Sequence, residues 1–115
     1  MKKNFKIAAS ICFSIFLFSS CTKEEAAPQV AKITYVTDIK PIIVANCTPC
    51  HLSGGGNPNK WDDYLQAKNK IASILDRIQR EPGTTGAMPN GAKTKLSTET
   101  INKFKQWVTD GTLEK

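Results

Sequence analysis

The sequence has little net charge, and half of the excess lies at its start. The 115 residues carry a formal charge of +6, but the first twenty contain three lysines and no acid. Without that segment the net charge falls to +3. The remaining basic residues do not alternate with aromatics, as a groove for single-stranded nucleic acid requires. We therefore expect no nucleic-acid partner, and the length allows one small domain.

The sequence also lacks a hydrophobic run long enough to cross a membrane as a helix. The longest, residues 7–18, has twelve residues, whereas a bilayer core about 30 Å thick needs about 20. Together with the lysines before it, this run is typical of a signal peptide. The Phe-Ser-Ser-Cys sequence ending at Cys21 resembles a bacterial lipobox, with Phe18 where leucine is usual. We expect residues 1–20 to be a lipoprotein signal peptide; ordinary cleavage and a retained anchor are the alternatives.

The segment after the signal peptide, residues 21–34, lacks hydrophobic periodicity. It is charged and contains several alanines and a proline, so we expect an acylated Cys21 followed by a flexible tether. The Lys-Glu-Glu just after Cys21 also resembles a surface-export signal of some Gram-negative lipoproteins. The expected location is the cell envelope, with the protein lipid-anchored to a membrane and facing the periplasm or the cell surface.

Cysteine is scarce, and each of the four has an expected role. Cys12 leaves with the signal peptide and Cys21 takes lipid, so no thiol remains for a structural disulfide once Cys47 and Cys50 are assigned. These two lie in the sequence Cys-Thr-Pro-Cys-His, and C-x-x-C-H is a haem attachment sequence. Thiols at i and i+3 of a helical turn share one face and can form thioethers with a single porphyrin. The following residue, His51, is then placed to ligate the iron.

A zinc site and a redox dithiol are the alternatives for this motif. His51 is the only histidine in the chain, and structural zinc needs four ligands in most cases. Only three soft ligands remain once Cys21 is acylated. A thioredoxin-like dithiol belongs in a βαβ context, which is absent. We therefore expect one covalently bound haem c.

Methionine occurs only once after the start residue, at Met88, which we expect to be the second axial ligand of the iron. It lies in a loop beside Pro89, whose ring fixes φ and stiffens the chain. An uncharged thioether favours Fe(II) relative to a second imidazole and so raises the potential. The alternatives are a methionine that packs against haem without ligating it, a lysine ligand, and an open site.

Hydrophobic periodicity predicts an all-α domain over residues 35–115, with no strand. A first helix, with Thr37 as its N-cap, runs directly into Cys47. Residues 61–70 and 71–80 read as helical, either as two helices or as one. Glycine- and proline-containing loops separate these elements.

A last helix is expected between an N-cap at Ser97 and a C-terminal glycine at Gly111. Its buried stripe is expected to be Ile101, Phe104, Trp107 and Val108.

Residues 35–112 resemble the small monohaem cytochrome c fold of the His/Met type. The resemblance rests on Cys47, Cys50 and His51, on Met88 with its following proline, and on Trp107 and Gly111 of the closing helix. It implies a cytochrome c-like fold of three to four helices wrapped around one covalently attached haem. The apolar surface of the haem would be lined by Ile43, Leu75, Ile78, Phe104 and Trp107.

The expected function is one-electron transfer by a membrane-tethered monohaem cytochrome c, without catalytic residues and with redox proteins as partners. The alternatives are a haem enzyme or gas-sensing haem domain with a labile distal ligand, and a structural haem lipoprotein subunit of a larger redox complex. A peroxidase-like enzyme needs a distal His or Arg. His51 is already used, and we expect Arg77 and Arg80 to lie on the helix face away from the site. Lysines able to ring an exposed haem edge are Lys60, Lys93 and Lys95.

Overall fold

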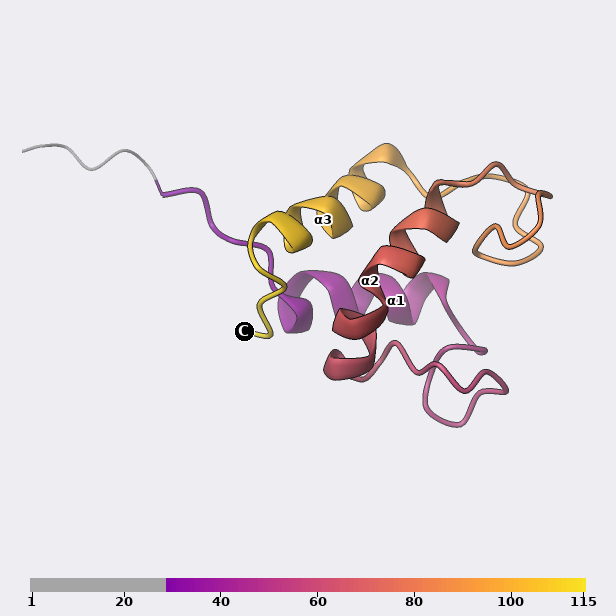
Figure 1. Cartoon of the computed structure of the whole chain (residues 1–115), viewed down its shortest axis with the longest axis horizontal. Helices are drawn as coiled ribbons and strands as arrows, with labels where there is room; N and C mark the ends of the chain where they lie inside the picture. Colours follow the sequence, from indigo (N-terminus) through magenta and orange to yellow (C-terminus); the bar gives the residue numbers. More distant parts are fainter. Residues whose placement is uncertain (1–28) are drawn as a thin grey trace, which may run out of the picture.

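The structure of the protein is a computed structural model that describes residues 29–115. Within this range the chain forms four helical segments and no strand, which confirms the all-α prediction (Figure 1). They are η1 (Tyr35–Ile39), α1 (Lys40–Asn46), α2 (Tyr64–Gln79) and α3 (Thr98–Thr109). The expected signal peptide, Cys21 and most of the expected tether lie outside the described residues.

The first helix begins earlier than predicted. Thr34, not Thr37, is the N-cap: the Thr34 hydroxyl accepts the Thr37 N–H at 3.4 Å, and its carbonyl accepts those of Asp38 and Ile39. The Asp38 carboxylate in turn accepts the Thr34 N–H at 2.9 Å. This reciprocal bonding satisfies the free N–H groups at a helix start and explains the earlier boundary. η1 is a short π-helical segment, and it continues directly into α1.

The central segment is one helix, as the second of the two alternatives predicted, but it does not start at Trp61. Trp61 lies in a turn, and α2 begins at Tyr64 after its N-cap Asp63, whose carboxylate accepts the Gln66 N–H at 2.9 Å. An aspartate at this position satisfies a free N–H, so the start follows the cap rather than the first apolar residue. At Arg80 the backbone becomes extended, two residues before Pro82.

The last helix confirms both of its predicted ends. The Ser97 hydroxyl accepts the Thr100 N–H at 3.1 Å, and Gly111 follows the helix with a φ of +92°. Val108, however, is 43% exposed, so its assignment to the buried stripe was wrong. Trp107 takes the buried position, and consecutive helical residues point about 100° apart.

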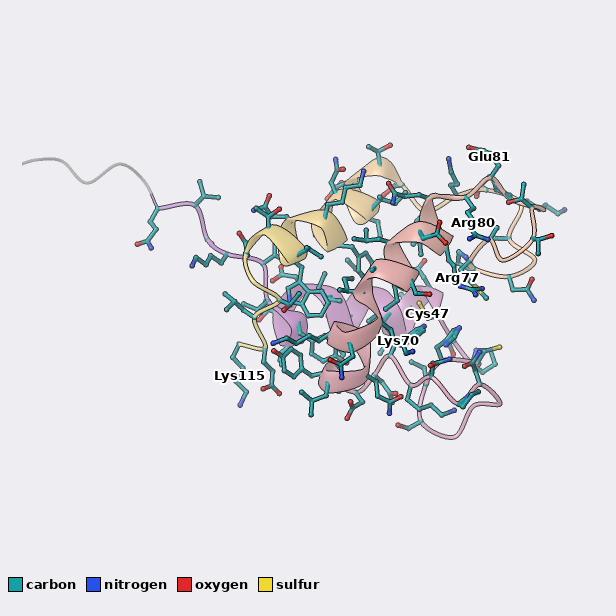
Figure 2. The ribbon with its side chains drawn as sticks, in the orientation of Figure 1. Cys47, Lys70, Arg77, Arg80, Glu81 and Lys115 are labelled. Carbon is teal, nitrogen blue, oxygen red and sulfur yellow. The ribbon has the colours of Figure 1, made fainter. Side chains whose placement is uncertain are left out.

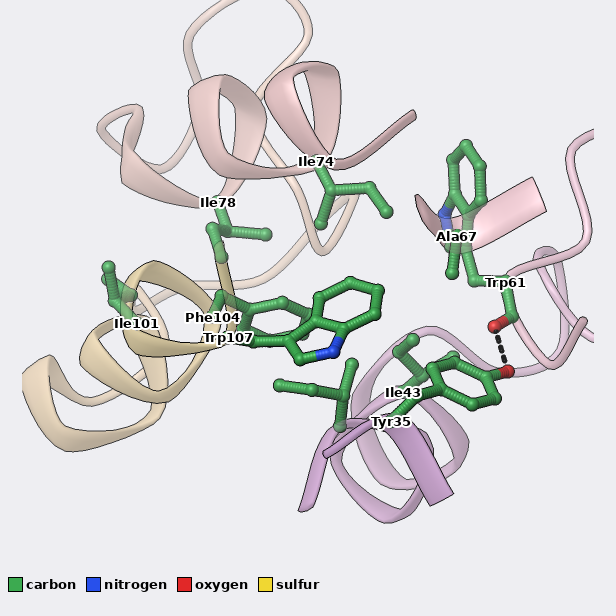
Figure 3. Packing of buried hydrophobic residues seen from close by; sticks show 10 residues of the cluster. Tyr35, Ile43, Trp61, Ala67, Ile74, Ile78, Ile101, Phe104 and Trp107 are labelled. Carbon is green, nitrogen blue, oxygen red and sulfur yellow. Dashed lines mark hydrogen bonds between the residues drawn. The ribbon is translucent and has the colours of Figure 1, made fainter. Parts of the chain in front are cut away.

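The core forms where α3 contacts both α2 and η1 (Figure 3). Phe104 and Trp107 of α3 lie between Ile74 and Ile78 of α2 on one side and Ile43 and Tyr35 of the first helix on the other. The Trp107 indole N–H donates to the Leu113 carbonyl at 2.8 Å, and the Tyr35 N–H donates to the same oxygen at 2.9 Å. The end of the chain therefore fastens α3 to the first helix.

Two long loops complete the domain. One runs from Cys47 to Asp63 and the other from Arg80 to Ser97, and both lie on the same side of the helices in Figure 1. Residues of both loops line one cavity together with α2. Residues of α2 thus form one wall of the cavity, and the two loops carry Cys47, Cys50, His51 and Met88.

Candidate functional site

The cavity between the two loops has a volume of about 480 Å³. Sites for small molecules and cofactors span roughly 300–1,000 Å³. Cys47, Cys50 and His51 from the first loop and Met88 from the second all line it. The structure therefore brings together all four residues predicted for the domain's cofactor site, although Met88 is far from the other three in the sequence.

The two cysteines lie on one hydrogen-bonded turn that follows α1, and not on a turn of the helix as predicted, because α1 ends at Asn46. The Cys47 backbone N–H donates to the Ile43 carbonyl at 2.8 Å, and the His51 backbone N–H donates to the Cys47 carbonyl at 3.0 Å. Cys47 is half-buried and Cys50 exposed, and both are free thiols. This turn presents two thiols and an imidazole to the same cavity, as the spacing predicted.

The Cys47 thiol is not suited to redox exchange. Burial raises its pKa to about 11, so it is protonated near neutral pH. Dithiol redox sites instead have a cysteine with a lowered pKa, because the thiolate is the nucleophile. This environment disfavours the redox-dithiol alternative.

His51 is held in one tautomer by the loop that follows it. Its side chain is only 8% exposed, and Nδ1 lies 2.9 Å from the Asn59 carbonyl oxygen. Because a carbonyl can only accept, the neutral imidazole carries its proton on Nδ1, which leaves Nε2 with its lone pair. Metal-ligating histidines are usually fixed in this way. The indole of Trp61 stacks on the imidazole, with ring centroids 4.8 Å apart and planes 17° apart.

The Asn59 carbonyl is itself positioned by hydrogen bonds within the loop. The Asn57 side-chain oxygen accepts the Asn59 N–H at 2.8 Å, while the Asn57 N–H donates to the Cys50 carbonyl at 3.1 Å. The Trp61 N–H donates to the His51 carbonyl at 2.7 Å. The sequence offered no signal for Asn57 or Asn59, since a loop rich in asparagine and glycine predicts only a turn.

Trp61 is fixed from its other side by Tyr35. The Tyr35 hydroxyl donates to the Trp61 carbonyl at 2.7 Å, and burial, with nearby carboxylates, raises the pKa of Tyr35 to about 12. Tyr35 also contacts Trp107, with ring centroids 5.9 Å apart. The stacking of Trp61 on His51, the hydrogen bond from Tyr35 to the Trp61 backbone and the contact of Tyr35 with Trp107 therefore connect His51 to the main core.

The hydrophobic lining of the cavity differs from the predicted one. Of the five residues expected there, only Ile78 lines the cavity, together with Trp61, Ile74 and Leu96, which were not expected. Ile43, Phe104 and Trp107 are buried in the contacts between helices, and Leu75 packs at the edge of the core. Periodicity identifies the buried face of a helix but not what covers it.

Arg77 was predicted to lie away from the site, and this was wrong. Arg77 and Lys70 both line the cavity, because seven residues make about two helical turns and share one side of α2 (Figure 2). No aspartate or glutamate is among the described residues that line it. The wall formed by α2 is therefore positively charged at its rim. Arg80 does not line the cavity, as predicted.

The three lysines expected around the site do not line the cavity in the described part of the chain. Lys60 donates from Nζ to the Gly55 carbonyl at 2.6 Å, and Lys95 forms an ion pair with Glu81. Lys93 is exposed. Lys70 is the lysine at the cavity instead.

Two further features are absent from residues 29–115. These residues contain no cluster of three or more His, Cys, Asp or Glu side chains arranged to hold a metal ion. Nor does this part of the chain include a helix with the length and apolar character to span a membrane. Comparisons with protein-family models, curated proteins and solved structures gave no match. The side chains that line the cavity are therefore the basis on which a function can be assigned.

Proposed function

We propose that this protein is a small c-type cytochrome that carries single electrons. Its one haem would be attached through Cys47 and Cys50 and ligated by His51 and Met88. The observation that carries the proposal is the cavity lined by all four side chains, with His51 held by Asn59 in the tautomer that leaves Nε2 for a metal. The spacing of the thiols on one turn agrees with two thioether bonds to one porphyrin.

The side chains around the cavity suit a haem in polarity and in charge. A haem has an apolar ring, two vinyl groups and two anionic propionates. Ile74, Ile78 and Trp61 offer apolar surface, while Lys70 and Arg77 offer positive charge without a competing carboxylate. Bound there, haem would supply an iron that alternates between Fe(III) and Fe(II). Two protein ligands would leave no position for a substrate, which favours a carrier.

Arg77 favours a second candidate, a haem enzyme or gas-binding domain with a labile distal ligand. Its backbone carbonyl accepts the Met88 N–H at 3.1 Å, so Arg77 lies beside the proposed distal ligand and lines the same cavity. If Met88 were displaced, the guanidinium would be a nearby donor for an anionic or polar ligand. A structural haem subunit of a larger redox complex would need the same site.

Spectroscopy of the purified full chain tests the proposal. Haem should stay with the protein after denaturation and acid extraction, and Cys47→Ser with Cys50→Ser should abolish this retention. The oxidised wild type should show a weak sulfur-to-iron band in the near infrared, lost in Met88→Ala. Stoichiometric and fast carbon monoxide binding by the reduced wild type would instead favour the second candidate. Equal covalent haem in the double cysteine variant would refute attachment at this turn.

We further propose that Cys21 is acylated and tethers the domain to a membrane in the cell envelope, where it meets redox partner proteins. The support is the signal-peptide pattern and the lipobox-like sequence. The wild type should partition into detergent, and Cys21→Ser should move the protein to the soluble fraction or leave an uncleaved precursor. A wild type that is already soluble and normally cleaved would exclude the lipid anchor without affecting the haem proposal.

A further inference from the structure

Arg80, at the end of α2, connects the helix to the loop that carries Met88. Its Nη1 donates to the Thr85 carbonyl at 2.6 Å, and its Nη2 pairs with the Asp76 carboxylate at 2.6 Å. Asp76 lies one turn earlier in the same helix, so it fixes the guanidinium against α2. The loop backbone at Thr85 is therefore held to the rigid helix through a single side chain.

The absence of a side chain at Gly86 allows the Arg80 guanidinium to approach the loop backbone closely. The φ of Gly86 is +78°, and an added Cβ would lie 2.6 Å from Arg80 Nη1 and 3.3 Å from Arg77 Nη1. The guanidinium of Arg80 thus packs directly against the loop backbone. Gly83 and Gly91, in the same loop, also have positive φ, but an added Cβ would meet nothing within 4 Å. Only Gly86 of these three combines the backbone conformation with a neighbour that would be displaced.

Met88 follows this contact by two residues. The Ala87 N–H donates to the Thr84 carbonyl at 3.1 Å, and the Met88 N–H donates to the Arg77 carbonyl at 3.1 Å. The segment from Thr84 to Met88 therefore turns back onto the last turn of α2, and the Met88 side chain reaches the cavity from there. Arg80 is the side chain that donates to the backbone of this segment.

We propose that Arg80, fixed by Asp76, is a positioning residue that holds Met88 at the cavity wall. The inference rests on the proposed function, in which Met88 is the distal ligand. Arg80 and Asp76 are 39% and 58% exposed, and exposed ion pairs contribute little to global stability. Loss of the pair should therefore loosen the loop while the helices and the attachment turn stay folded.

The test measures how easily an exogenous ligand replaces Met88 in the full-chain holoprotein. Arg80→Gln and Gly86→Ala should each weaken the near-infrared sulfur-to-iron band. Both should bind imidazole roughly tenfold more tightly than the wild type, the scale of one lost hydrogen bond to a charged group. Covalent haem content should not change. Gly83→Ala is the matched control, because it adds the same Cβ at a positive φ without touching Arg80.

The Met88→Ala variant distinguishes an effect of Arg80 on the position of Met88 from a direct effect on the incoming ligand. In Met88→Ala, where there is no methionine to hold, adding Arg80→Gln should change imidazole affinity less than twofold. A full tenfold effect in that background would show that Arg80 acts on the incoming ligand and would overturn the proposal. Equal effects of Gly83→Ala and Gly86→Ala would also overturn it, because backbone strain would then explain both.

Amide hydrogen exchange distinguishes failure of this inference from failure of the proposed function. The Met88 N–H bond to Arg77 needs no iron, so its exchange should accelerate at least tenfold in Arg80→Gln whatever the site binds. The Phe104 amide in the core should exchange as in the wild type. A wild type without a sulfur-to-iron band would refute the proposed ligation, whereas unchanged exchange at Met88 would refute the role of Arg80.

Discussion

Gly55 offers a sharp test of how the first loop supports the attachment turn. An added Cβ at Gly55 would collide with the Pro49 carbonyl oxygen and lie 2.7 Å from the Cys50 carbonyl oxygen. Both are backbone atoms of the attachment turn, so no flexible side chain can move aside to make room. Overpacking that forces the backbone to shift costs about 1–3 kcal/mol. We expect Gly55→Ala to lower the free energy of unfolding by about 2 kcal/mol within that range.

Gly56 is the matched control for this substitution. It is the next residue, has no positive φ, and an added Cβ there would meet nothing within 4 Å. Gly56→Ala should change the free energy of unfolding by less than about 0.5 kcal/mol. In urea, with a slope of about 1 kcal/mol per molar, the midpoint measured by circular dichroism should fall by about 2 M in Gly55→Ala only. Covalent haem yield should fall with it. Equal midpoints for both variants would refute the close packing of this loop on Pro49 and Cys50.

Two further substitutions test the surroundings of His51. Asn57→Ala removes the acceptor of the Asn59 N–H, so the Asn59 carbonyl should hold the imidazole of His51 less firmly. Because the hydrogen bond from Nδ1 makes the imidazole a stronger donor to a bound metal, we expect the variant to have a higher reduction potential. An unchanged potential would contradict this role of the loop. Hydrogen bonds from Ser53 hold the pKa of Asp62 below its usual value in the folded protein. The stability that Asp62 contributes is therefore fully present above the unfolded pKa of about 3.9. It is lost as the pH falls through the lower pKa of the folded state. The stability difference between wild type and Asp62→Asn should therefore shrink in acid, and a constant difference from neutral pH to pH of about 2 would contradict the linkage.

The fold was predictable where a local signal decided it. Ser97 and Gly111 mark the ends of α3 by capping chemistry within a few residues, and both ends were confirmed. The start of the first helix was not predicted, because Thr34 and Thr37 are equally good caps by residue type. The Asp38 carboxylate that bonds back to Thr34 decides between them. That choice depends on a geometry that single residues do not reveal.

In the candidate site, too, the residues that could be predicted are those with a local sequence signal. Cys47, Cys50 and His51 could be found because their spacing is short and chemically specific, and Met88 because methionine is so scarce. The structure places all four at one cavity; their roles remain proposals. Lys70 and Arg77 were missed as cavity residues, since the sequence does not show which side of α2 meets the loops.

Arg77 and Arg80 lie at the same end of α2, but their side chains have different surroundings. The two residues are three apart, so they lie near each other at the end of α2, and both guanidinium groups approach Gly86. Arg80 is neutralised by Asp76 and bonded to the loop backbone, whereas Arg77 lines the cavity beside Met88. A positive charge that is already paired can hold the loop without attracting the anionic groups of a cofactor. The charge offered to the cavity then comes from Arg77 and Lys70, and the position of Met88 depends on a residue that does not line it.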